Sequence, residues 1–115
     1  MFDQRFIYHL ESIFFLGTLS AQTKNFSRAI RLFNKVIKIN PNIADVHSNL
    51  GLVFNQLADF EKGINCYEKA IKIKPDYADA YNNLGNSYKG LKNFEKAITY
   101  YEKTIEINSS YADAY

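Results

Sequence analysis

The sequence predicts an all-α fold, an α-solenoid of three antiparallel helical hairpins that stops at the start of a fourth. Two observations support this prediction. The sequence repeats itself every 34 residues, and within each repeat the apolar residues follow helical spacing in two blocks separated by a short polar break. A composition that is 47% hydrophobic and 16% aromatic is ample for a packed core, which argues against a disordered chain.

The repeats are clearest in the second half of the chain. The string Tyr-Ala-Asp-Ala-Tyr starts at Tyr77 and again at Tyr111, 34 residues later. The segment from Ala44 aligns without a gap on the segment from Ala78, and a weaker copy starts at Leu10. We therefore expect a divergent first repeat over residues 10–43, a second over 44–77 and a third over 78–111, with residues 1–9 as a lead-in to the first helix and residues 112–115 as the start of a fourth repeat.

Each repeat is expected to fold as a hairpin of two helices, here called helix A and helix B. In the third repeat the inward stripe of helix A is expected to consist of Tyr81, Leu84, Tyr88 and Leu91. The inward stripe of helix B is expected to consist of Phe94, Ala97, Ile98, Tyr101 and Ile105. Stacked hairpins bury such stripes against each other and against the next repeat.

Short polar residues and prolines mark the expected ends of the helices. One repeat position just before helix B holds side chains that can accept a free backbone N–H, so we expect N-caps at Asn25, Asp59 and Asn93. Prolines follow helix B and prevent it from continuing, at Pro41 and Pro75. Asn42 or Asp76 can then begin the next helix A.

Each helix A carries a glycine near its middle, at Gly17, Gly51 and Gly85. A glycine inside a helix costs about 1 kcal/mol relative to alanine, so a compensating contact is expected. The facing position on helix B is also small in every repeat, with Ala29, Gly63 and Ala97. We expect the two backbones to approach closely at this crossing.

The pattern of Leu-Gly, then Tyr or Phe, Ala, Phe or Tyr, Ala and Pro, at a period of 34 residues, resembles the tetratricopeptide repeat. In the third repeat these places are taken by Leu84, Gly85, Tyr88, Ala97, Tyr101, Thr104 and Ser109. Thr104 and Ser109 depart from the Ala and Pro of the family. The resemblance covers residues 10–111 and implies a right-handed superhelix whose concave surface is lined by helix A.

The resemblance also implies a peptide-binding groove on this concave surface. In the second repeat its side chains are expected to be Asp45, Ser48, Asn49, Leu52, Asn55 and Gln56. In the third repeat they are expected to be Asp79, Asn82, Asn83, Asn86 and Lys89. The same positions of the first repeat hold Glu11, Phe14, Phe15, Thr18 and Gln22.

Asn49 and Asn83 occupy equivalent groove positions one repeat apart. An amide can donate and accept hydrogen bonds to the main chain of an extended peptide, and such a ladder is similar to the one in the repeat arm of O-linked N-acetylglucosamine transferases. Phe15 takes this position in the first repeat and limits the ladder to two rungs. The basic clamp with which other members of the family hold a C-terminal carboxylate is missing, because Phe14, Asp79 and Asn83 stand at its positions.

From this resemblance we interpret the chain as a non-catalytic protein–protein interaction scaffold that binds a peptide or protein segment in the helix A groove. One alternative is the substrate-recruiting arm of a larger transferase, similar to an O-GlcNAc transferase or a sulfotransferase. Another is a structural module that self-associates through an uncapped C-terminal end. No polar capping helix follows the third repeat, so its helix B should show apolar surface.

Other residue types give no sign of a catalytic, metal or cofactor site. The sequence holds no nucleophile and base motif and no Gly-rich phosphate loop, so we expect neither an enzyme nor a cofactor. Cys66 is the only cysteine and cannot form an intramolecular disulfide, and it reads as a partly buried helix B residue. His47 takes the place of Tyr81 one repeat earlier, which favours a packing role over a metal or catalytic role.

Charge and hydropathy give little sign of nucleic acid or membrane partners. The net charge of +2 is far from the concentrated basic field that binding to a phosphate backbone needs. No apolar run reaches the roughly 18 residues of a membrane span, and no signal peptide is recognisable. We expect a soluble, cytoplasmic chain whose partners are proteins or peptides.

Overall fold

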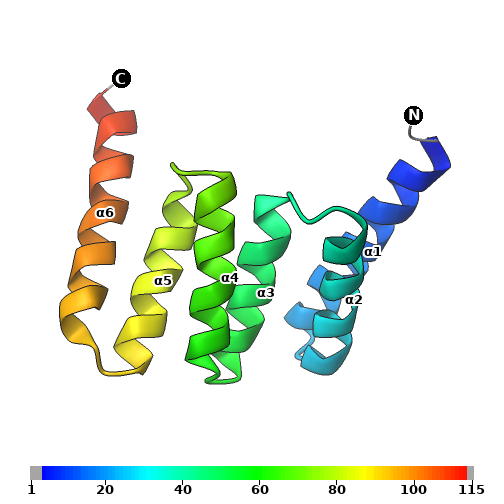
Figure 1. Cartoon of the computed structure of the whole chain (residues 1–115), viewed down its shortest axis with the longest axis horizontal. Helices are drawn as coiled ribbons and strands as arrows, with labels where there is room; N and C mark the ends of the chain where they lie inside the picture. Colours follow the sequence, from blue (N-terminus) through cyan, green and yellow to red (C-terminus); the bar gives the residue numbers. More distant parts are fainter. Residues whose placement is uncertain (1–3, 114–115) are drawn as a thin grey trace.

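The computed structural model describes residues 4–113, and in this range it consists of six α-helices in chain order (Figure 1). They are α1 (Gln4–Gln22), α2 (Phe26–Ile39), α3 (Ala44–Gln56), α4 (Phe60–Ile73), α5 (Ala78–Gly90) and α6 (Phe94–Asp113). The helices lie side by side along the 44 Å long axis, with the two ends of the chain at opposite ends of the array. The predicted all-α solenoid of three helical hairpins is confirmed. None of the described helices is both long enough and apolar enough to cross a bilayer.

The contacts between helices give the array an inner and an outer side. Each of α2 and α4 packs against its own helix A and against the helix A of the next repeat. The three A helices also contact one another in sequence, α1 with α3 and α3 with α5, whereas within residues 4–113 the three B helices do not. Because the A helices contact one another across repeats and the described B helices do not, the array curves with α1, α3 and α5 on its inner side.

The turns from helix A to helix B are built alike in all three hairpins. A residue with positive φ follows each helix A: Lys24 (63°), Ala58 (59°) and Lys92 (63°). In the second hairpin the N–H of Ala58 donates to the carbonyl of Asn55, and the N–H of Asp59 donates to the carbonyl of Phe54 at 2.8 Å. This pair of bonds is a Schellman motif, which satisfies carbonyls that the end of a helix leaves free.

The predicted N-caps of the B helices are confirmed. The side chains of Asn25, Asp59 and Asn93 each accept a backbone N–H three residues later, at 3.4, 3.4 and 3.3 Å. The A helices start differently from the expectation, because the residues before α3 and α5 are Ile43 and Tyr77, and neither caps its helix with a side chain. Asn42 and Asp76 therefore lie one residue too early to cap these helices.

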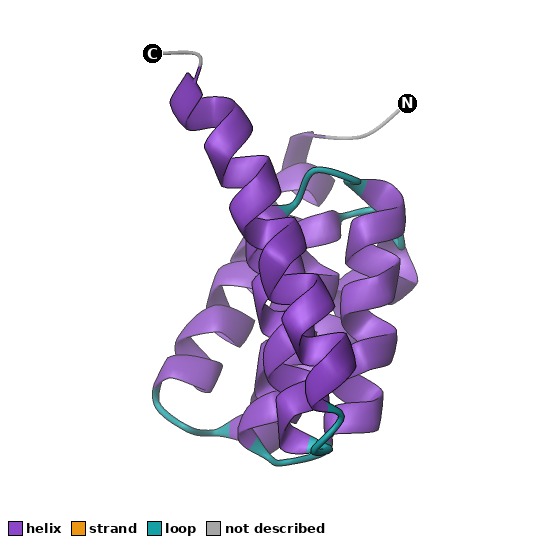
Figure 2. Ribbon diagram, turned by 90° about the vertical axis from the view of Figure 1, so that its left-hand side faces the viewer, coloured by secondary structure: helices purple, strands orange, loops and turns teal. Residues whose placement is uncertain are grey.

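The first and last helices are longer than the repeat unit predicts. Helix α1 starts at Gln4, so residues 4–9, expected as a lead-in, already belong to the helix. Helix α6 runs without a break to Asp113, beyond the point where a fourth repeat was expected to begin at Ala112, and it projects past the other helices (Figure 2). Ser109 stands where Pro75 ends the previous hairpin, and serine, unlike proline, lets a helix continue. Residues 114 and 115 lie outside the described range.

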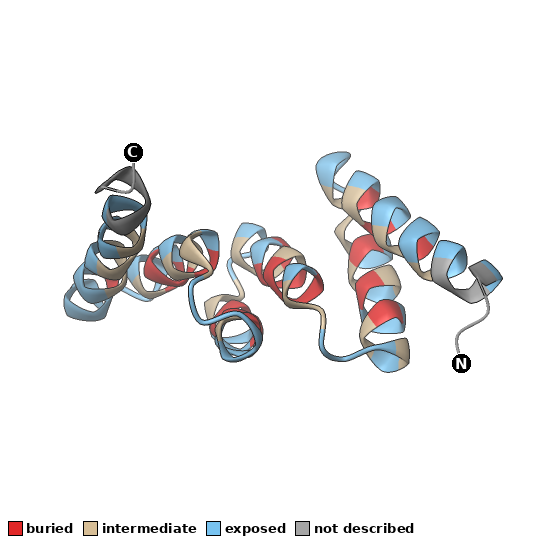
Figure 3. Ribbon diagram, turned by 90° about the horizontal axis from the view of Figure 1, so that it is seen from above, coloured by how far each residue is buried: buried red, intermediate tan, exposed pale blue. Residues whose placement is uncertain are grey.

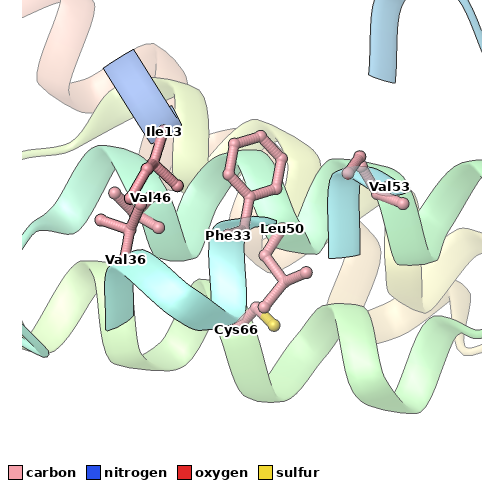
Figure 4. Packing of buried hydrophobic residues seen from close by; sticks show 8 residues of the cluster. Ile13, Phe33, Val36, Val46, Leu50, Val53 and Cys66 are labelled. Atoms are coloured by element: carbon pink, nitrogen blue, oxygen red, sulfur yellow. The ribbon is translucent and has the colours of Figure 1, made fainter. Parts of the chain in front are cut away.

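The hydrophobic core follows the interfaces between successive hairpins. Its first cluster joins four helices through Ile13, Ala29, Phe33, Val36, Val46, Leu50, Val53 and Cys66 (Figure 4). A second cluster joins α4 and α5 through Ile64, Tyr67, Ala70, Ala80 and Leu84. Burial is greatest on the central helices, whereas most described residues of α6 are exposed (Figure 3).

The predicted inward stripes of the third repeat are only partly buried. Leu84 and Ala97 are buried, and Tyr81, Tyr88 and Tyr101 are half-buried. The remaining members, expected to face inward, are exposed: Leu91, Phe94, Ile98 and Ile105. The expectation of apolar surface on this helix B is confirmed, since Phe94, Ile98 and Ile105 expose 58%, 56% and 64% of their surface.

The helix A glycines make room for aromatic rings. A Cβ on Gly51 would lie 2.9 Å from the ring of Tyr67, and Gly17 and Gly85 face Phe33 and Tyr101 in the same way. The expected close approach of the two backbones is present in the second hairpin, where a Cβ on Gly63 would lie 3.3 Å from the Gly51 carbonyl oxygen. Each glycine therefore serves mainly to seat the large ring that helix B inserts against helix A.

Candidate functional site

The inner face of α1, α3 and α5 carries most of the predicted groove side chains. On α3 and α5, seven of them are exposed: Asp45, Leu52, Gln56, Asp79, Asn82, Asn86 and Lys89. Asn49 and Asn83, the two rungs of the predicted ladder, are half-buried. These nine side chains come from two neighbouring helices, α3 and α5, which contact each other directly.

Two predicted groove residues have other roles. Ser48 is buried, with 5% of its surface exposed, so it belongs to the packing of α3 and not to the groove. Asn55 is tied to α5: its Nδ2 donates to the carbonyl of Asn83 at 3.2 Å, and its Oδ1 accepts from the hydroxyl of Ser87 at 2.7 Å. The period places Ser48 and Asn55 on helix A, but it gives no sign that Ser48 is buried or that Asn55 bonds to α5.

A second polar bridge joins α3 to the start of α5. The phenol of Tyr77 donates to Oδ1 of Asp45 at 2.7 Å. The pKa of Tyr77 is raised to about 12, chiefly because the phenol is buried and secondly because of this hydrogen bond to Asp45. The α3–α5 interface is therefore closed at one end by Tyr77 and at the other by Asn55.

The α1–α3 interface lacks both bridges. Ile43 stands at the repeat position of Tyr77, and Ala21 stands at that of Asn55. Val53 likewise replaces Ser87 as the potential donor. Neither Ile43 nor Ala21 can donate a side-chain hydrogen bond, and both are smaller than their counterparts. Two cavities lie between α1 and α3, one beside each of these residues.

The upper cavity, next to Ile43, has a volume of about 220 Å³. Its floor is apolar and consists of Leu10, Phe14, Val36, Ile43 and Val46. Its rim consists of Glu11 and Phe15 from α1 and Asp45 from α3, all three exposed. The rings of Phe14 and Phe15 meet edge to face with their centroids 5.6 Å apart.

The lower cavity, next to Ala21, has a volume of about 200 Å³. Its walls include Thr18 and Gln22 on α1 and Asn49, Leu52 and Gln56 on α3, all of them polar except Leu52. The hydroxyl of Thr18 donates to the carbonyl of Phe14 within its own helix. The side chain of Asn49 has no hydrogen-bond partner among the residues whose side chains the structure describes, so its amide can both donate and accept.

The two rungs of the predicted ladder differ in their surroundings. Oδ1 of Asn83 accepts a long hydrogen bond of 3.4 Å from the amide of Asn86. Asn86 in turn accepts from the phenol of Tyr101 at 2.6 Å. Asn49 has no such neighbour, because Leu52 stands at the repeat position of Asn86. The structure thus leaves the amide of Asn49 more available to a ligand than the amide of Asn83.

His47 and Cys66 have structural surroundings, as their repeat positions predict. The Nε2 of the buried His47 donates to the carbonyl of Pro41 at 2.8 Å, and the phenol of Tyr81 donates to the carbonyl of Pro75 at 3.1 Å one repeat later. Burial raises the pKa of the Cys66 thiol to about 11, which keeps it in its unreactive neutral form at neutral pH. In the described part of the chain, His, Cys, Asp and Glu side chains form no group of three that could hold a metal ion.

Comparisons with family models agree with the period. Residues 10–43 and 78–111 match models described as tetratricopeptide repeat, and residues 53–92 match a model described as TPR repeat. Among curated proteins, none gives a significant match to the sequence.

Solved structures resemble the whole array. A crystal structure of MamA is 31% identical, covers 90% of this chain and superposes with a TM-score of 0.86. This chain spans 61% of that MamA chain and 57% of a second one at the same identity. The Arabidopsis OM64 TPR domain is 20% identical, with 87% of this chain and 83% of that chain covered and a TM-score of 0.83.

A further solved structure was determined with a ligand. The first TPR of Spaghetti (RPAP3), bound to the HSP90 peptide SRMEEVD, is 19% identical, with 85% of this chain and 78% of that chain covered and a TM-score of 0.82. At such low identity, this structure and the OM64 domain support the fold alone.

Proposed function

Because this chain belongs to the tetratricopeptide repeat family, we propose that it is a non-catalytic protein-interaction scaffold that holds a segment of a partner protein against the inner face of α1, α3 and α5. The observation that carries the proposal is the open α1–α3 interface, which holds two cavities, the lower of them lined by the unpaired amide of Asn49. A groove with apolar walls and a few unpaired polar groups is the usual form of a peptide site.

The partner segment lies in an extended conformation across the A helices. The amide of Asn49 bonds to its main chain, and Asn83 provides a second rung once its 3.4 Å bond to Asn86 is exchanged for the ligand. The exposed groove side chains contact the side chains of the segment: Asp45, Leu52, Asp79, Asn82, Asn86 and Lys89. Ser48 and Asn55 are left out of this site, since the first is buried and the second joins α3 to α5.

The proposed ligand differs in charge from the acidic HSP90 peptide bound to the RPAP3 domain. An acidic peptide needs basic side chains on the inner face. Here Glu11, Asp45 and Asp79 occupy one position of the three successive A helices, and Lys89 is the basic residue among the predicted groove side chains. The proposal therefore concerns a partner that an acidic, partly apolar groove can accept.

Site-specific photo-crosslinking tests the proposal. A photo-reactive phenylalanine analogue at Leu52, on the inner face, should crosslink to partner proteins in a lysate, and the Asn49→Ala variant should reduce this capture. The matched control carries the analogue at Asn65, an exposed residue of α4 on the outer side, and should capture far less. Equal capture from the two positions, or capture that Asn49→Ala leaves unchanged, would remove the inner face as the binding surface.

Self-association is a second candidate function, favoured by the apolar face of α6. Phe94, Ile98 and Ile105 each expose more than half of their surface on this one helix. Sedimentation velocity over a concentration series should then show a dimer that the Ile98→Lys variant dissociates, because a buried lysine without a partner opposes association. A monomer at every concentration would leave this face without a role in self-association.

A further inference from the structure

We propose that the upper cavity between α1 and α3 binds a positively charged side chain, arginine or lysine, of the partner segment. This inference rests on the proposed function and adds the chemistry of the side chain that the groove selects. It starts from the difference between two neighbouring interfaces of the same array: Tyr77 fills the α3–α5 interface, and Ile43 leaves the α1–α3 interface open.

The charge of the rim favours a cation. Two carboxylates face the cavity from opposite sides, Glu11 on α1 and Asp45 on α3, and none of the residues that line it is basic. Glu11 has no ion-pair or hydrogen-bond partner among the residues whose side chains the structure describes. Asp45 uses Oδ1 for Tyr77, which leaves Oδ2 available. A cation placed between the two carboxylates is attracted by both, and no other charge on the rim opposes it.

The apolar part of the cavity fits the stem of the same side chain. Arginine and lysine bury their methylene groups along apolar surfaces while the charged head stays at the rim. The floor offers Val36, Ile43 and Val46, and the volume of about 220 Å³ is several times the roughly 30 Å³ of a water molecule. Phe15, with 57% of its surface exposed, offers a ring face on which the cation can stack.

In the α3–α5 interface, a hydrogen-bond donor occupies the place that corresponds to the upper cavity. Tyr77 packs there between α3 and α5 and donates its phenol to Asp45, the carboxylate at the repeat position of Glu11. In the α1–α3 interface the chain supplies no such donor, because Ile43 has none. Each interface is flanked by two carboxylates, Asp45 and Asp79 at α3–α5 and Glu11 and Asp45 at α1–α3, and the neutral phenol of Tyr77 bonds to only one of its pair. A side chain with a full positive charge therefore matches this rim better than tyrosine does.

Host peptides of one design test the selectivity. The probes are acetyl-Ala-Ala-X-Ala-Ala-amides in which X is Arg, Lys, Tyr, Leu or Glu, titrated into the ¹⁵N-labelled chain and followed by amide chemical shifts. The Arg and Lys peptides should shift the amides of residues 10–15 and 43–46 and bind roughly tenfold more tightly than the Leu peptide, the scale of one charge-assisted contact. This preference should weaken as the salt concentration rises.

Two variants and a control locate the effect. Glu11→Gln keeps the shape of the rim and should remove most of the preference for Arg over Leu, because one of the two carboxylates is lost. Ile43→Tyr should fill the cavity as Tyr77 fills the next interface, abolish the peptide-induced shifts in residues 10–15 and raise the melting temperature. Glu61→Gln, on an exposed carboxylate of α4, should leave unchanged both the preference for Arg over Leu and the peptide-induced shifts in residues 10–15.

The possible results separate this inference from the proposed function. If the Arg and Leu peptides shift the same amides with equal affinity, the groove binds peptides but the preference for a cation is wrong. Tighter binding of the Tyr or Glu peptide than of the Arg peptide also overturns the preference. If no peptide shifts any amide of the inner face, both the preference and the peptide-binding groove are rejected.

Discussion

At the scale of single residues, the contact between Gly51 and Tyr67 explains why a glycine lies in the middle of a helix. Tyr67 is fully buried, and three of its ring atoms lie only 2.9 to 3.1 Å from the place that a Cβ at position 51 would take. The cost of glycine in a helix is about 1 kcal/mol, less than the roughly 3–5 kcal/mol that burial of a large aromatic side chain can be worth in a core. The packing of the Tyr67 ring therefore explains why position 51 holds glycine.

The Gly51→Ala variant should be destabilised. Its Cβ would lie 2.9 to 3.1 Å from three atoms of the Tyr67 ring, which the core around it prevents from moving aside. Overpacking of this kind costs about 1–3 kcal/mol, which equals or exceeds the roughly 1 kcal/mol gained in helix propensity. The free energy of unfolding in urea measures the difference, with Asn65→Ala, an exposed substitution within α4, as the control that should be neutral or slightly stabilising. A net gain for Gly51→Ala would mean that the ring can move.

The sequence indicates which residues belong to helix A, but not which of them find partners across the interface. Its period correctly places Asn49 and Asn83 at equivalent positions, yet only the structure shows that Asn86 bonds to one of them. Asn55 was predicted to face a ligand because of its position in the repeat. Its bonds to Asn83 and Ser87 depend on two residues of the next repeat, which a comparison of equivalent positions does not consider.

At the scale of the elements, the turn after each helix A holds a residue in the left-handed region. Ala58 has a φ of 59°, and its N–H takes part in the Schellman motif that ends α3. A residue with a Cβ pays about 1–2 kcal/mol to adopt this conformation, which glycine adopts freely. The motif most often has glycine at this position, so the chain carries a local strain here.

Ala58→Gly should stabilise the protein by about 0.5–1 kcal/mol. The relief of strain in the turn is partly offset by the greater freedom of glycine in the unfolded chain. Thermal and urea unfolding measure the gain, and Lys92→Gly should show a similar gain in the third hairpin, where φ is 63°. Lys69→Gly, at an exposed position inside α4, should have the opposite sign and cost about 1 kcal/mol. A loss of stability in Ala58→Gly would show that the turn is not strained.

The ends of the elements could be predicted where a single residue controls them. Asn25, Asp59 and Asn93 are N-caps because a short polar side chain before helix B satisfies a free N–H within the same turn. The extent of α6 could not be predicted in this way. The period suggests a break near Ser109, but a serine leaves the outcome to the packing around the helix, which local sequence does not encode.

At the scale of the whole molecule, the two interfaces between successive A helices are unequal. Asp45 and Tyr77 close one end of the α3–α5 interface, and Asn55 with Ser87 closes the other. The α1–α3 interface has cavities of about 220 and 200 Å³ at the corresponding places. The difference between the two interfaces depends on pairs of residues from adjacent helices. It could not be predicted from the sequence, because only the structure shows which residues form a pair.

The first hairpin should therefore open more easily than the second. In a solenoid each hairpin is stabilised mainly by its neighbours, so the α3–α4 hairpin, covered on both sides, should show the slowest amide hydrogen exchange. The α1–α2 hairpin should exchange faster, because its interface with α3 has cavities and lacks the two polar bridges.

Two reciprocal substitutions test this explanation by hydrogen exchange and mass spectrometry. Ile43→Tyr supplies a phenol beside Glu11 and should slow exchange in α1 and α2, with little change in α6. Tyr77→Ile removes the phenol from Asp45, opens the α3–α5 interface and should speed exchange in α5 and α6 by the loss of about 1–3 kcal/mol of packing and hydrogen bonding. If exchange in all six helices changed together in both variants, the array would unfold as one cooperative unit. The cavities between α1 and α3 would then have no separate effect on the first hairpin.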